Sequence, residues 1–263
     1  MSILLICGTV LWIIAANIIN KNMRIAISGT ANTGKSTLIQ SFLHTWTNYI
    51  TPDRTYRDVI KEGNLDHSSN TTTDTQTVIL DSFLDQQQKR VTDNIVYDRC
   101  TLDALAYTIW CFEKGLEGFD SEYVQKQIAI VKESMRSLDL IFLCKFDEKQ
   151  AVIDDGFRDT DIEYIKEIDN IFESLYQQYF QNVHSDVFFP KDDSPAVIKL
   201  PDNPQERVDL IAEYVTPEGG MYGEEHSILN PENIGELEQL VMQQKRAQEA
   251  DEADKELFKK FGL

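Results

Sequence analysis

The chain has 263 residues, 42% of them hydrophobic, and a formal net charge of −19. That length accommodates one α/β domain of about 200 residues plus an appendage. The acidic charge argues against a protein that wraps duplex nucleic acid, although a local basic pocket for a small phosphorylated substrate is compatible with it. The four cysteines contain no C-x-x-C pair, so we expect neither disulfides nor a zinc site, and we expect a cytoplasmic protein.

Residues 1–22 form an N-terminal extension in which 3–19 are almost entirely apolar. That length is the lower limit for a transmembrane helix, and Lys21 and Arg24 would then keep the following domain on the cytoplasmic side. Three interpretations stay open: a dispensable extension before a natural start at Met23, a membrane anchor, or an extra packed element. A cleaved signal peptide fits less well, because no basic region precedes the apolar run.

The stretch RIAISGTANTGKSTLIQSFLHTW, from Arg24 to Trp46, organises the rest of the chain. Its residues 29–36 fit G-x-x-x-x-G-K-[ST], the phosphate-binding P-loop. A β-prone run precedes the motif, and apolar residues at helical spacing follow it, so we predict a buried strand and then a helix that opens at Lys35 or Ser36.

The residue types of this loop suit phosphate binding. Gly29 and Gly34 permit backbone conformations that let successive N–H groups point at phosphate oxygens, and the new helix adds its positive dipole end. Lys35 would bridge the β- and γ-phosphates, and Ser36 would be a ligand of Mg²⁺. The sequence therefore predicts a nucleoside triphosphate site formed by Gly29, Thr30, Ala31, Asn32, Thr33, Gly34, Lys35, Ser36 and Thr37.

A short second strand is predicted within residues 48–51, followed by a charged loop over 51–57. Loops after the strands of an open α/β sheet line the ligand crevice, so Asp53, Arg54 and Arg57 are candidate substrate contacts; a solvated loop is the alternative. Residues 63–70 are expected to be a polar loop.

A helix is predicted over residues 75–89, with Asp74 as its N-cap. Val78, Ile79 and Phe83 would face the core, and Gln76 would lie near the helix start.

Residues 94–97 are predicted to form the next buried strand, which delivers Asp98 and Arg99 at its C-terminal end. Beside a P-loop, such a carboxylate can hold a magnesium-bound water or take a proton from an attacking hydroxyl. The arginine can neutralise charge on a transferring phosphoryl group. We therefore predict a catalytic pair.

Helices are expected over 102–112, 121–138 and 161–180, with a strand at 139–144. The first of these helices carries Asp103 and Tyr107, four residues apart, as candidate substrate contacts. The charged stretch 154–159 contains Arg158. An arginine between a strand and a helix suits a lid that covers phosphates; an ordinary surface loop is the alternative.

Residues 187–189 and 197–200 are both strand candidates, of which the second is preferred as the last strand. A helix should run from Asn203 to Val215. Residues 217–220 contain Pro and two Gly and mark a boundary, which gives a domain over 23–216 and an acidic helical tail over 217–263. The tail would pack on the domain or mediate homo-oligomer formation.

The chain from about Met23 to Val215 resembles the P-loop nucleoside/nucleotide kinases. GTANTGKST, YDRCTLDALAY and DDGFRD before a helix carry the resemblance. It is similar in these motifs to AAA-domain proteins that include the nicotinamide riboside kinase domain, and to thymidylate and deoxynucleoside kinases.

This resemblance implies a three-layer α/β sandwich with a parallel five-stranded sheet in the order 2-3-1-4-5. It implies ATP and Mg²⁺ at Lys35 and Ser36, a nucleoside or nucleotide acceptor facing Asp98 and Arg99, and Arg158 in the lid. In these relatives the base can be an acidic residue after the second strand, so Asp53 competes with the preferred Asp98. Gln76 would match a glutamine that reads the substrate base.

The expected activity is transfer of the γ-phosphate of ATP to a nucleoside or nucleotide. One alternative is a kinase acting on a modified base or an end of a polynucleotide. Another is a regulatory P-loop ATPase whose output is conformational.

Overall fold

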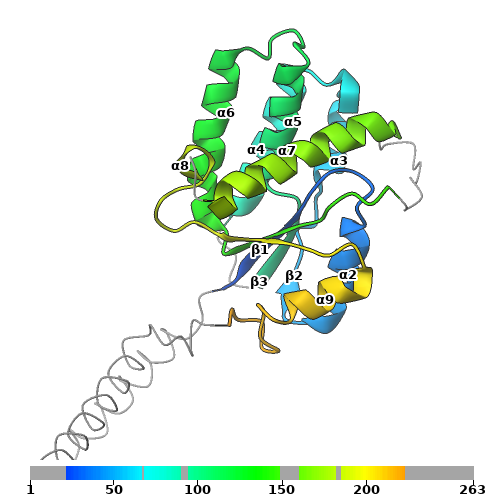
Figure 1. Ribbon diagram of the computed structural model, residues 1–263, viewed down its shortest axis with the longest axis vertical. Helices are drawn as coiled ribbons and strands as arrows, with labels where there is room; N and C mark the ends of the chain where they lie inside the picture. Colours follow the sequence, from blue (N-terminus) through cyan, green and yellow to red (C-terminus); the bar gives the residue numbers. More distant parts are fainter. Residues whose placement is uncertain (1–21, 67, 90–93, 149–159, 182–184, 223–263) are drawn as a thin grey trace, which may run out of the picture.

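The computed structural model describes residues 22–66, 68–89, 94–148, 160–181 and 185–222 (Figure 1). The apolar run 3–19, the segment with Arg158 and the tail beyond residue 222 lie outside the described residues. In the described ranges, no helix combines the length and the apolar character that a membrane span requires.

Five strands form one parallel sheet in the order β2-β3-β1-β4-β5, which confirms the predicted order. Their bounds are β1 (Arg24–Ser28), β2 (Tyr49–Ile50), β3 (Asn94–Asp98), β4 (Leu140–Leu143) and β5 (Ala196–Lys199). Because all strands run in one direction, their C-terminal ends meet at one edge, where ligands of open α/β sheets bind.

The helices lie in two layers, one on each side of the sheet, so the fold is the predicted three-layer sandwich. Figure 1 shows α2 and α9 on one side and α4, α5, α6 and α7 on the other. Their bounds are α2 (Lys35–Thr45), α3 (Tyr56–Gly63), α4 (Thr73–Gln88), α5 (Thr101–Glu113), α6 (Ser121–Ser134), α7 (Ile162–Gln181), α8 (Ser185–Phe188) and α9 (Pro204–Ile211), with 3₁₀ turns at Ser68–Asn70 and Met135–Ser137.

The sheet divides the core into two clusters, because successive side chains of a strand point to opposite faces. On β1, Ile25 and Ile27 pack with α2 and α9, in a cluster that includes Trp46. Ala26 faces the other cluster, which the remaining helices build around residues such as Trp110. Side chains on both faces of β1 are therefore buried, as expected for a central parallel strand.

Helix α3 is absent from the sequence-based expectation, which assigned residues 51–57 to a loop. A capping box begins this helix: the Asp58 carboxylate accepts hydrogen bonds from the backbone N–H and the hydroxyl of Thr55, at 2.8 and 2.7 Å. That arrangement satisfies helix N-terminal donors, and it places Arg57 in the first turn of a helix.

The start of α4 and the orientation of its side chains also differ from the prediction. The N-cap is Thr72, whose hydroxyl accepts from Thr75 N at 3.2 Å, and not Asp74. Val78 is 38% exposed, whereas Ile79 and Phe83 are buried as predicted and Leu80 is buried with them.

Two corrections concern the C-terminal part of the domain. Residues 187–189, the rejected strand candidate, lie in and just after the short helix α8, while β5 forms where the preferred candidate was. Helix α9 ends at Ile211, earlier than the predicted Val215, and a turn closed by Thr216 N donating to Gly220 O follows. Trp46 Nε1 and the Tyr49 hydroxyl donate to Thr216 O and Gly219 O of this turn, at 2.9 and 2.6 Å.

Candidate active site

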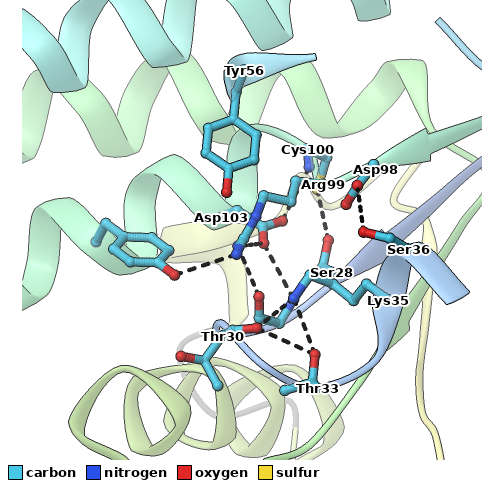
Figure 2. Close-up of polar contacts among 12 residues, drawn as sticks. Ser28, Thr30, Thr33, Lys35, Ser36, Tyr56, Asp98, Arg99, Cys100 and Asp103 are labelled. Atoms are coloured by element: carbon cyan, nitrogen blue, oxygen red, sulfur yellow. Dashed lines mark hydrogen bonds and ion pairs between the residues drawn. The ribbon is translucent and has the colours of Figure 1, made fainter. Parts of the chain in front are cut away.

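The P-loop connects β1 to α2 at the C-terminal edge of the sheet, and α2 opens at Lys35, as predicted (Figure 2). The nine predicted nucleotide-binding residues, 29–37, lie together in this connection. Gly29 has φ 134°, and a Cβ there would lie 2.3 Å from the carbonyl oxygen of Cys144, just beyond β4. Only glycine fits this close approach of two backbone segments.

Gly34 ends the loop in the left-handed conformation (φ 80°) and is the N-cap of α2, where it provides no side-chain hydrogen bond to the helix. The first turn of α2 therefore offers its N–H groups to a ligand, and the helix dipole favours an anion there. Thr30 and Thr33 use their hydroxyls on backbone carbonyls, Ile165 O and Thr30 O, each at 3.2 Å. The backbone conformation of the loop therefore suits the binding of a phosphate group.

Lys35 is buried and folds back onto the loop. Its ammonium donates to Thr30 O and, at 3.0 Å, to Thr33 Oγ1. Burial, followed by repulsion from Arg99, lowers the pKa of Lys35 to about 7. A phosphate bound at this loop would bring further negative charge next to Lys35 and favour its protonated form.

Ser36 and Asp98 meet at this edge, from α2 and from the end of β3. The Ser36 hydroxyl donates to Asp98 Oδ2 at 3.3 Å (Figure 2). The register of the sheet brings them together, since Ile27 of β1 is paired with Asp98. A hydroxyl and a carboxylate oxygen are the hard ligands that Mg²⁺ prefers, with phosphate oxygens completing its shell, so the predicted magnesium ligands fit this ion.

Arg99 is buried and occupies the left-handed region, with φ 76°. A bulky residue rarely adopts this conformation, and such strain is often associated with function. Its Nη1 donates to Gly29 O at 2.8 Å and to Asp103 Oδ1 at 2.7 Å. The guanidinium carbon lies 5.2 and 5.5 Å from the ring centres of Tyr56 and Tyr107. The second residue of the Asp-Arg pair thus lies against the P-loop.

Asp103, predicted as a substrate contact, is 1% exposed. Besides Arg99, its carboxylate accepts from Gly29 N at 3.2 Å and from Cys100 N at 3.0 Å. The carboxylate thereby links the start of α5 to the start of the P-loop (Figure 2). These contacts are those of a group that positions the site. Asp103 is the third residue of α5, and its contact with Cys100 N is that of a capping box, a signal that can be read from an acidic residue three positions after a helix N-cap.

The remaining candidates for contact with the acceptor differ in their burial and in their partners. Arg57, on α3, is half-buried; its Nε donates to the Tyr56 hydroxyl at 3.4 Å. Its pKa is raised: burial acts to lower it, and Tyr56 and then Asp98 outweigh that effect. Arg57 is therefore close enough to Asp98 to feel its charge. Arg54 is exposed and pairs with Glu62.

Asp53 is exposed in the loop before α3, and no hydrogen bond joins it to another described residue. Gln76 is 4% exposed; its Nε2 donates to Thr71 Oγ1 at 2.9 Å, while its buried Oε1 has no partner among the described residues. An amide oxygen left in this state can accept a hydrogen bond from a ligand.

Sequence reasoning missed one buried cation at the P-loop. Arg207, on α9, donates from Nη1 to Thr33 O at 2.5 Å. No motif marks it, because more than a hundred residues separate it from the loop, and only the packing of α9 on α2 brings them together.

A P-loop beside an Asp-Arg pair on a parallel sheet of this order defines a P-loop NTPase with the nucleoside-kinase fold. The family model described as an AAA domain matches residues 24–187. The chain therefore belongs to this AAA domain family. No curated protein matches its sequence.

Several solved structures share the fold. Deoxyadenosine kinase from M. mycoides, with the products dCMP and a flexible dCDP, superposes with a TM-score of 0.51 and 18% identity over 72% of this chain and 96% of that one. The same enzyme with bound dATP gives 0.51 and 19% over 72% and 97%. The NadR protein in complex with NR gives 0.53 and 18% over 73% of this chain and 51% of NadR, so this chain spans about half of NadR.

Proposed function

We propose that the protein is an ATP- and Mg²⁺-dependent phosphotransferase that moves the γ-phosphate of ATP to a nucleoside or nucleotide. The contact that carries this proposal is the 3.3 Å hydrogen bond from Ser36 to Asp98, which sets a carboxylate beside the P-loop and its lysine. A carboxylate in this position can take the proton of an acceptor hydroxyl that attacks the γ-phosphate of the bound triphosphate.

On the donor side, the loop N–H groups and Lys35 would bind the phosphates of ATP, and Ser36 and Asp98 would hold Mg²⁺. When bound, Mg²⁺ would neutralise the negative charge that develops on the phosphates. The protein contributes the position of these groups, which are already in place through the contacts of Gly29, Asp103 and Arg99.

On the acceptor side, the attacking hydroxyl forms a bond to the γ-phosphorus while the bond to the β–γ bridging oxygen breaks and ADP leaves. We assign the hydroxyl proton to Asp98 Oδ1, because only Oδ2 accepts a hydrogen bond from the described residues. Arg99, and Arg57 beside it, would stabilise the negative charge of the transferring group. Asp98 is favoured over Asp53 as the base, since Asp98 contacts a P-loop residue.

The solved relatives support this class of acceptor, because the deoxyadenosine kinase structures contain deoxynucleotides and the NadR structure contains NR. Arg158 stays a proposed lid residue. The identity of the acceptor is what the following experiment determines.

The test incubates the full chain with γ-labelled ATP and Mg²⁺ against nucleosides, nucleoside monophosphates, nicotinamide riboside and short DNA. Transfer to one small acceptor, abolished in Lys35→Ala and in Asp98→Asn but kept in the matched Asp53→Asn, is the expected result. Label on DNA alone would favour the polynucleotide kinase. Free phosphate with no labelled acceptor would overturn the proposal and leave the ATPase switch.

A further inference from the structure

Arg207 is a buried cation that no motif and no expected role accounts for. It is 2% exposed and lies in α9, the helix that packs beside α2 (Figure 1). Its guanidinium joins two backbone segments: Nε donates to Pro201 O at 2.7 Å, and Nη1 donates to Thr33 O at 2.5 Å. One side chain therefore connects the loop after β5 to the P-loop.

Within the described part of the chain, the charge of this guanidinium has no ion-pair partner. Both of its acceptors are neutral carbonyls, and among the described residues no carboxylate forms an ion pair with it. Its Nη2 is also buried and donates to none of the described residues. Buried charges are normally paired, and a buried donor without an acceptor requires an explanation. An anion bound at the neighbouring loop would supply the missing negative charge.

The contact with Thr33 O has a direct consequence for the next peptide N–H. In a trans peptide the C=O and the following N–H point in opposite directions. When Arg207 holds Thr33 C=O on the α9 side, the N–H of Gly34 faces the opposite side of the loop. A hydrogen bond to a charged donor also polarises the peptide and strengthens its N–H as a donor. Nη1 lies 3.5 Å from where a Cβ on Gly34 would be, so the guanidinium packs directly on this peptide.

We propose that Arg207 is a positioning residue of the donor-phosphate site: from α9 it orients the Thr33–Gly34 peptide toward the phosphates and adds a positive charge behind the loop. The inference rests on the proposed function only in taking a nucleoside triphosphate as the ligand. Because the planar guanidinium donates to both carbonyls at once, lysine cannot replace it fully.

The test measures binding of Mg-ATP and of inorganic triphosphate to the full chain by calorimetry, in wild type, Arg207→Lys and Arg207→Gln. We expect both ligands to bind about tenfold more weakly to Arg207→Gln, equivalent to about 1.4 kcal/mol, and less weakly to Arg207→Lys, which retains the charge. In the labelling assay the KM for ATP should rise while the KM for the acceptor stays unchanged.

Arg24→Lys is the matched control. Arg24 also bridges two backbone carbonyls, Gln87 O and Lys89 O, but at the start of β1, the opposite edge of the sheet. Dissociation constants within twofold of wild type for Arg207→Gln would overturn the proposal, as would equal weakening by Arg24→Lys. Absence of phosphate transfer would instead contradict the proposed function, because the binding measurement needs no acceptor.

Discussion

The donor side and the acceptor side of the site differ in how firmly their groups are held. On the donor side, Lys35, Asp103 and Arg207 are all buried and hydrogen-bonded to the P-loop backbone or its hydroxyls. On the acceptor side, Asp53 is exposed, Arg54 pairs with a surface glutamate, and Gln76 has an unused amide oxygen. The groups around the P-loop are therefore fixed by the fold, whereas those on the proposed acceptor side have capacity left for a ligand.

The largest expected effect tests the rigidity of the donor side through Asp103→Ala. The change leaves the buried Arg99 without its ion-pair partner, and we expect a loss of about 3–5 kcal/mol in the free energy of unfolding, measured by urea titration. Glu122→Ala is the control, because Glu122 and Lys126 form an exposed ion pair at the same four-residue spacing. Its urea midpoint should match wild type; equal losses in both variants would remove the contrast between buried and exposed pairs.

Gly29→Ala should have the next largest effect. The added Cβ meets Cys144 O, and φ 134° is strained for alanine, so we expect about 2–4 kcal/mol of destabilisation and loss of ATP binding. Gly115→Ala shares the positive φ but has open space around the new Cβ. It should lose only about 1–2 kcal/mol and keep ATP binding. If the two variants behave alike, the close approach of the P-loop to β4 is not what requires glycine.

The P-loop and Asp98 could be predicted from the sequence for a physical reason, whereas the contacts of Asp103 with Arg99 and Gly29 could not. Gly29 and Lys35 are constrained by short-range geometry, because a strand, a turn without room for a Cβ and a helix start follow one another within about a dozen residues. Parallel strands then bring Asp98 to the same edge. Arg207 could not be predicted, because its contact with Thr33 depends on how α9 packs on α2. Helix α3 was missed although Thr55 and Asp58 carry a capping signal, because its eight residues are fewer than the roughly 11 to 18 over which helical periodicity is normally recognised.

A third prediction concerns pH and the burial of Lys35. Between its lowered pKa of about 7 and the ordinary value of 10.5, the unfolded chain holds a proton that the folded chain releases. The free energy of unfolding should therefore rise with pH across this window, and the contribution should be flat below it. Urea unfolding of the nucleotide-free protein at pH 6, 7.5 and 9 measures the slope. Lys35→Met should reduce this slope. Parallel curves for wild type and Lys35→Met would mean that folding does not lower the pKa of Lys35.

The smallest effects are expected on the acceptor side, where Arg57 should matter more than Arg54. Arg57→Ala should lower kcat/KM for the acceptor by about tenfold, because Arg57 is half-buried and electrostatically coupled to Asp98. Arg54→Ala should change it less than about twofold, since exposed ion pairs contribute little. Steady-state kinetics with the acceptor found by labelling would measure both. The reverse order would place the acceptor near the exposed loop.

The division of the core by the sheet gives each half its own optical reporter. Trp46 lies in the cluster with α2 and α9, and Trp110 lies in the other, edge-on to Tyr164. Variants that keep one tryptophan and replace the others with phenylalanine would let intrinsic fluorescence follow each layer separately during denaturation. Coincident transitions would show that the two layers unfold as one cooperative unit. Separate transitions would show that the layer containing α2 and α9 can unfold independently of the other layer.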